Sequence, residues 1–179
     1  MAISAVVAVG AIGDPLVKMV ADKAAKVKVG PGDGEGVDMG PLVTLAHRDK
    51  VAGYIDTGVA EGAKLVVDGR NKKIAGHENG FFLGTTLFDQ VKTNMKIYQD
   101  EIFGPVLVVL RADTIEEAIA LVNANPYGNG TAIFTNSGGA ARRFQEEIQV
   151  GMVGVNVPIP VSAWACSPAA AWARACCWA

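Results

Sequence analysis

The residues best suited to binding or catalysis lie in one short segment, Gln99-Asp100-Glu101-Ile102-Phe103-Gly104-Pro105. A carboxylate such as that of Glu101 can accept two hydrogen bonds from the hydroxyl groups of a sugar, and a ring such as that of Phe103 can pack on a flat heterocycle. The Gly-Pro pair predicts a rigid bend. Because an apolar run follows, we expect Glu101 and Phe103 at the carboxyl-proximal rim of a sheet, where α/β proteins bind ligands. The same spacing also fits an ordinary turn.

Two other patterns bear on chemistry, the histidines and a glycine-rich run. His47 and His77 are the two histidines, and their spacing alone leaves a Ser-His-Asp arrangement open. No Gly-x-Ser-x-Gly places a nucleophilic serine on a sharp turn, so we interpret both as surface residues. A helical pattern precedes Gly30–Gly36 and a loop follows it, which is not the strand-glycines-helix order of a dinucleotide fingerprint. We interpret this run as a flexible connector.

The last eighteen residues, 162–179, differ in composition from the rest of the chain. They hold eight alanines, all three tryptophans, all three cysteines and one charged residue. The spacing of Cys166, Cys176 and Cys177 matches no zinc-binding pattern. We interpret this segment as coding sequence translated out of frame, with an unstructured apolar tail as the alternative.

The elements that must position the 99–105 segment alternate between helical and strand patterns. This alternation predicts an α/β fold with a largely parallel sheet flanked by helices. The continuous apolar run Val106–Leu110 is typical of a strand buried on both faces. Two amphipathic helices are predicted over residues 44–61 and 114–124, each with a threonine as N-cap. Further expected elements are a helix starting at Asp14-Pro15 with Asp14 as cap, a helix over 138–147, a fully buried helix or strand over 2–9, and strands over 64–67, 81–83, 131–134 and 152–155.

Length and composition set the class of protein. The 179 residues suit one domain, and half of them are hydrophobic, which excludes a disordered polyampholyte. Sixteen basic and eighteen acidic residues give a net charge of -2, with no basic face for a nucleic acid. No apolar run reaches the roughly 18 residues needed to cross a bilayer, and the opening residues lack the positive charge of a signal peptide. We expect a cytoplasmic protein without nucleic-acid or membrane partners.

The 99–105 segment resembles a motif of the aldehyde dehydrogenase superfamily, Glu-x-Phe-Gly-Pro. Over residues 1–161 the chain is more narrowly similar to the CoA-acylating methylmalonate-semialdehyde dehydrogenases. One departure is Asn129, where the superfamily usually has leucine. The other segments that carry the resemblance are Met1–Ser4, Met39–Leu42, Phe81–Thr86, Asn123–Thr135 and Gly151–Asn156.

The resemblance implies NAD-dependent oxidation of a semialdehyde to an acyl-CoA in valine and thymine catabolism, with CoA as co-substrate. Glu101 would hydrogen-bond the nicotinamide ribose and Phe103 would pack beside the nicotinamide; no metal is implied. The nucleophilic cysteine of the family falls just before Met1, so we expect a catalytic-domain fragment, residues 1–161, that holds no catalytic residue and is inactive alone. The alternatives are a non-catalytic module that docks on full-length dehydrogenase subunits or on further copies of itself, and a gene remnant.

Overall fold

The computed structural model describes residues 3–158, which divide into two compact units at the boundary between Ala112 and Asp113. The predicted atypical tail, residues 162–179, lies outside the described residues, and the predicted extent of the catalytic fragment, 1–161, stays a prediction. Within residues 3–158, no helix has the length and apolar character that crossing a membrane requires. Each unit is described by itself.

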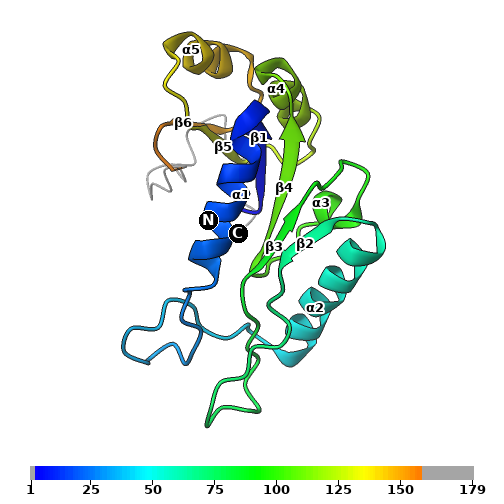
Figure 1. The fold of residues 1–179 in the computed structure, drawn as a ribbon, viewed down its shortest axis with the longest axis vertical. Coiled ribbons are helices and arrows are strands. Elements are labelled where there is room, and N and C mark those ends of the chain that lie inside the picture. Colours follow the sequence, from blue (N-terminus) through cyan, green and yellow to red (C-terminus); the bar gives the residue numbers. More distant parts are fainter. Residues whose placement is uncertain (1–2, 159–179) are drawn as a thin grey trace, which may run out of the picture. The chain divides into compact units, whose positions relative to one another are not determined.

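The first unit is built on a four-stranded sheet with the order β1-β4-β3-β2 (Figure 1). Both β1 and β3 pair in parallel with β4, and β2 pairs antiparallel with β3. This arrangement confirms the predicted α/β class and the largely parallel sheet. The strands are β1 (Ala5–Val9), β2 (Lys64–Val67), β3 (Thr86–Asp89) and β4 (Val106–Ala112).

Helices cover both faces of this sheet, because successive side chains of a strand point to opposite faces. On one face, α1 (Gly13–Ala24), which follows the short 3-10 turn η1 (Gly10–Ile12), places Val17 in a core with Leu87 of β3. On the other face, α2 (Leu45–Ala60) approaches Phe88 so closely that a Cβ on Gly58 would lie 2.9 Å from the ring. The short α3 (Lys96–Gln99) packs beside α2.

The start of α2 is confirmed and the predicted cap of α1 is wrong. Thr44 accepts a hydrogen bond from the backbone N–H of His47 at 3.1 Å, as an N-cap does. In α1 the N-cap position is Ile12, which has helical backbone angles because η1 runs directly into the helix. Asp14 therefore does not cap the helix, and its carboxylate pairs with Arg111 instead.

Two strand predictions need correction. Residues 81–83 form no strand, although Phe82 and Leu83 are buried, and the strand of this region is β3, five residues later. The pattern concealed β3 because its four residues are all buried and include a threonine and Asp89. The segment 2–9 is not buried throughout: β1 is an edge strand, and Val9 is exposed.

Over residues 113–158, the second unit contains two helices and a two-stranded parallel sheet. The helices are α4 (Ile115–Asn123) and α5 (Gly138–Glu147), and the strands are β5 (Gly130–Ile133) and β6 (Met152–Val155). Thr114 caps α4 by accepting from the N–H of Glu117 at 3.2 Å, as predicted. Asn123 links the ends of the two helices, since its side chain donates to the Glu147 carbonyl and accepts from the Gln149 N–H.

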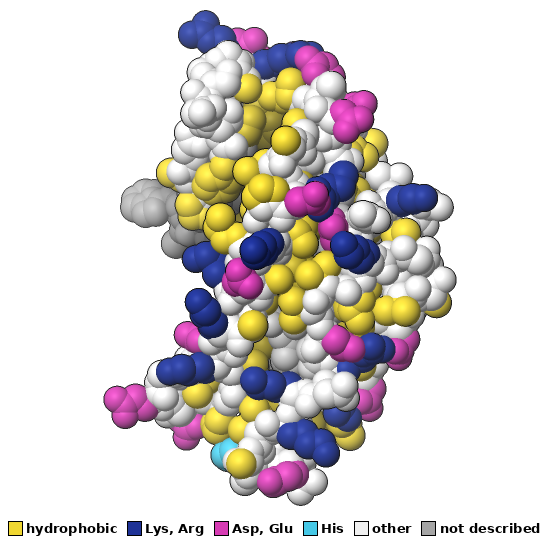
Figure 2. All heavy atoms as spheres, in the orientation of Figure 1, with side chains coloured by type: hydrophobic (Ala, Val, Ile, Leu, Met, Phe, Trp, Pro, Cys, Tyr) yellow, Lys and Arg dark blue, Asp and Glu magenta, His cyan; other side chains and the backbone are white. Residues whose placement is uncertain are grey.

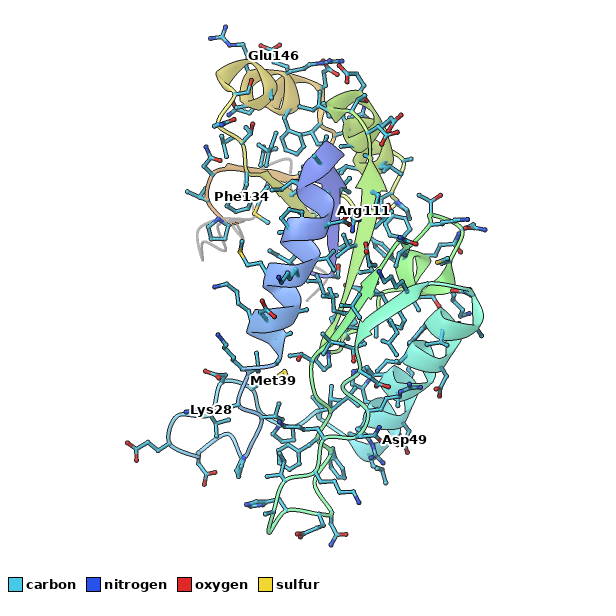
Figure 3. The ribbon with its side chains drawn as sticks, viewed as in Figure 1. Lys28, Met39, Asp49, Arg111, Phe134 and Glu146 are labelled. Carbon is cyan, nitrogen blue, oxygen red and sulfur yellow. The ribbon has the colours of Figure 1, made fainter. Side chains whose placement is uncertain are left out.

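One buried ion pair joins the carboxyl ends of β3 and β4 to α1. The side chain of Asp89 is 2% exposed and receives two hydrogen bonds from Arg111, from Nε at 2.9 Å and from Nη2 at 2.8 Å. Nη2 of Arg111 also reaches Asp14 at 2.9 Å, and the N–H of Gln90 donates to Asp89 at 2.8 Å. Figure 3 shows Arg111 beside α1 at the end of β4. The buried charge is therefore paired and hydrogen-bonded, as burial requires.

We predict that Asp89→Asn lowers the free energy of unfolding by about 3 kcal/mol, because it leaves the Arg111 guanidinium without its buried partner. Urea titration followed by circular dichroism measures the change. The matched control is Asp14→Asn. The carboxylate of Asp14 pairs with the same guanidinium but is 95% exposed, so we expect its loss to cost less than about 1 kcal/mol. Equal losses in the two variants would contradict the prediction.

The same ion pair predicts how stability depends on pH. Hydrogen bonds from Arg111, and secondly the Gln90 N–H, lower the pKa of Asp89. A lowered folded-state pKa adds stability that is present above the unfolded-state pKa, about 3.9, and is lost as the pH falls through the folded-state value. We expect the difference in urea midpoint between wild type and Asp89→Asn to be constant near neutral pH and to shrink below about pH 4. A difference that grows in acid would contradict this assignment.

Candidate functional site

The segment that carries Glu101 and Phe103 lies at the amino end of β4, not at a carboxyl-proximal rim. Both residues precede Val106, the first residue of the strand, and β1 and β3 run parallel to β4. The sequence-based placement is therefore wrong, because residues that lead into a strand lie at its amino end.

The turn presents one aromatic ring to the surface. Phe103 has a φ of 54°, in the left-handed region that residues with a side chain rarely adopt, and it is 63% exposed. Ile102, directly before it, is buried. Such strained residues persist only where their surroundings hold them, and they gather at functional sites.

The turn rests on α2 through a close approach that only glycine allows. A Cβ on Gly104 would lie 2.5 Å from Cγ1 and 2.8 Å from Cγ2 of Val51. Val51 is fully buried, and a β-branched side chain in a helix has one strongly preferred rotamer, so it cannot move aside. The glycine of the Gly-Pro pair thus lets the turn lie directly on the helix.

Two polar side chains of α2 also hold the turn. Nε2 of His47 lies 2.7 Å from the carbonyl oxygen of Phe103, and the hydroxyl of Tyr54 donates to Asp100 at 2.9 Å. His47 is partly exposed, and its ring also bonds the turn, a contact that the interpretation as a surface residue did not include. The other histidine, His77, lies in the exposed connector before β3, as predicted. His47, Val51 and Tyr54 follow helical i, i+4, i+7 spacing, a pattern in the sequence that places three residues on one face of a helix.

The geometry leaves Glu101 and Phe103 on either side of a buried anchor, Ile102, and both are exposed. A carboxylate can accept hydrogen bonds from sugar hydroxyls, and a ring held at the surface can pack on a heterocycle. Their roles toward a cofactor stay predictions. Residues 3–158 contain no cysteine and no cluster of three metal-ligating side chains.

Comparison with known proteins relates the chain to one family. The family model that matches residues 1–168 is described as the aldehyde dehydrogenase family. Malonate-semialdehyde dehydrogenase of Pseudomonas aeruginosa is 59% identical over 162 residues, 90% of this chain and 33% of that protein. The acylating methylmalonate-semialdehyde/malonate-semialdehyde dehydrogenase of Bos taurus is 52% identical over 158 residues, 88% of this chain and 29% of that protein.

A solved structure agrees with these relatives. The crystal structure of a candidate methylmalonate-semialdehyde dehydrogenase from Sinorhizobium meliloti 1021, complexed with NAD, superposes with a TM-score of 0.88 at 49% identity. The match covers 90% of this chain and 33% of that chain. The chain therefore spans about a third of the length of the proteins it matches.

We predict that Gly104→Ala lowers the free energy of unfolding by about 1–3 kcal/mol, because the new methyl group overpacks the contact with Val51. Chemical denaturation measures it. In the double variant Gly104→Ala/Val51→Ala the combined loss should be smaller than the sum of the single losses, since the clashing methyl groups are gone. The control is Gly53→Ala on the exposed side of α2, where an added Cβ meets nothing within 4 Å. Strict additivity in the double variant would refute the close approach.

Proposed function

The chain belongs to the aldehyde dehydrogenase family, and from this premise we propose that it is a catalytic-domain segment of a CoA-acylating, NAD-dependent methylmalonate-semialdehyde dehydrogenase. The reaction would oxidise methylmalonate or malonate semialdehyde and pass the acyl group to CoA. The observation that carries the proposal is the 52% identity to a relative whose name includes both semialdehydes and the acylating reaction. The 59% identity to a malonate-semialdehyde dehydrogenase supports the same substrate class.

The residues of this chain fit a nicotinamide cofactor at the 101–105 turn. NAD, when bound, supplies the hydride acceptor. Glu101 would accept hydrogen bonds from the nicotinamide ribose, and Phe103 would pack beside the nicotinamide. The support is that the turn leaves both side chains exposed and that the backbone of Phe103, which carries the ring, has a left-handed conformation. The NAD complex of the 49% identical relative supports the choice of cofactor.

We predict no turnover by this chain alone. Attack on an aldehyde in this chemistry needs a cysteine thiolate, and none lies among residues 1–165. Purified chain mixed with semialdehyde, CoA and NAD should produce no NADH above the rate without protein, as followed by absorbance. A steady rate that is proportional to chain concentration would overturn this prediction.

The positive test joins residues 3–158 to the remaining two thirds of the P. aeruginosa relative, in place of its matching third. We expect NAD- and CoA-dependent turnover with malonate semialdehyde. In this chimera Glu101→Gln should raise KM for NAD about tenfold, the factor for one hydrogen bond to a charged group. The control is Glu35→Gln, in an exposed loop of the same unit, which should leave KM unchanged. A normal KM in Glu101→Gln would remove the ribose role from Glu101.

Exposed apolar side chains favour a second candidate function, a non-catalytic module that docks on full-length dehydrogenase subunits. Ile3, Val9, Ile12 and Met19 are exposed around β1 and α1, and in Figure 2 apolar side chains reach the surface between charged ones. Large apolar side chains left exposed close together on a surface are typical of interaction sites. Retention of the chain by an immobilised intact dehydrogenase would favour docking, and a monomer that shows no retention would count against it.

A further inference from the structure

We infer that His47 is a positioning residue of the candidate cofactor site. By donating a hydrogen bond from Nε2 to the carbonyl oxygen of Phe103, it holds that residue in its left-handed conformation and sets the direction of the exposed ring. The inference rests on the proposed function for the ring's role toward a nicotinamide, whereas the hydrogen bond itself is a property of this chain.

The partner atom determines the chemistry of the imidazole. A carbonyl oxygen only accepts, so at 2.7 Å Nε2 must carry the proton. His47 is therefore either the neutral Nε2–H tautomer or the imidazolium, and the neutral Nδ1–H tautomer would face the carbonyl with a lone pair. The backbone N–H of His47 donates a hydrogen bond to Oγ1 of the N-cap residue Thr44 at 3.1 Å. The first turn of α2 therefore fixes the histidine backbone as well.

The conformation of Phe103 depends on contacts from outside the turn. A φ of 54° is rare for a residue with a Cβ, and the exposed ring of Phe103 leaves few packing contacts of its own to hold the backbone. Gly104 rests on Val51 and fixes how close the turn lies to α2. That apolar contact does not set the orientation of the Phe103–Gly104 peptide plane, and the hydrogen bond from His47 does, because it is directional.

The test uses the full 179-residue chain and nuclear magnetic resonance. Long-range proton–nitrogen spectra of the imidazoles should show His47 with a protonated Nε2 at neutral pH, and His77→Ala assigns the signals because it removes the other histidine. In His47→Ala the amide signals of Phe103 and Gly104 should shift, and His47→Gln, whose amide N–H can reach the same carbonyl, should restore them. His77→Ala should leave both amides unchanged.

The second readout is titration with NADH, followed by its fluorescence. We expect His47→Ala to raise the dissociation constant about fivefold, the factor for one hydrogen bond, and His47→Gln to return it to near the wild-type value. If wild type does not bind NADH, the proposed cofactor role of this turn fails, and the amide shifts alone decide the role of His47.

Two results would overturn the inference. One is an unprotonated Nε2 on neutral His47 in wild type, which needs no variant and so holds even if His47→Ala does not fold. The other is that the Phe103 and Gly104 amide signals stay unchanged in a folded His47→Ala variant. If that variant does not fold, the corresponding result is that a folded His47→Gln variant loses the wild-type positions of these amide signals.

Discussion

A carboxylate buried at the end of β3 is the constraint on which the first unit depends. Asp89 cannot be charged in the core without a cation and hydrogen bonds, and Arg111 supplies both through a two-point contact from the neighbouring strand. The same guanidinium reaches Asp14 and lies over Gly13 so closely that a side chain at residue 13 would collide with it. One pair of charges thus sets the register at the carboxyl ends of two strands and the position at which α1 begins.

The amino end of β4 is held by apolar contact and hydrogen bonds to α2, and not by a buried ion pair. Gly104 lies on Val51, Tyr54 holds Asp100, and His47 bonds the carbonyl of the left-handed Phe103. Holding a side-chain-bearing residue in this conformation costs about 1–3 kcal/mol, which the contacts with α2 offset. The strand is therefore fixed at its carboxyl end by a buried ion pair and at its amino end by apolar contact and hydrogen bonds from α2.

Much of this arrangement was predictable from local pattern. The Thr44 cap, the apolar run of β4 and the capped α4 each follow from residues close in sequence. The Asp89–Arg111 pair and the bond from His47 to Phe103 join residues 22 and 56 positions apart, and no local periodicity encodes such partners. For the same reason β3 was missed: a strand with a buried aspartate looks polar until its arginine is known.

The pairing of β1 with β4 has a consequence for synthesis of the chain on the ribosome. Ala5 is in register with Val108, so this parallel pair cannot form until more than a hundred residues have been made after β1. Closing so long a loop makes the contact late and slow, and until then the apolar β1 and the inner face of α1 stay uncovered in the nascent chain. The helix α2 ends at Ala60 and β4 begins at Val106, so the helix is synthesised before the strand that it must anchor. This order places the time of greatest exposure to chaperones just before β4 is translated.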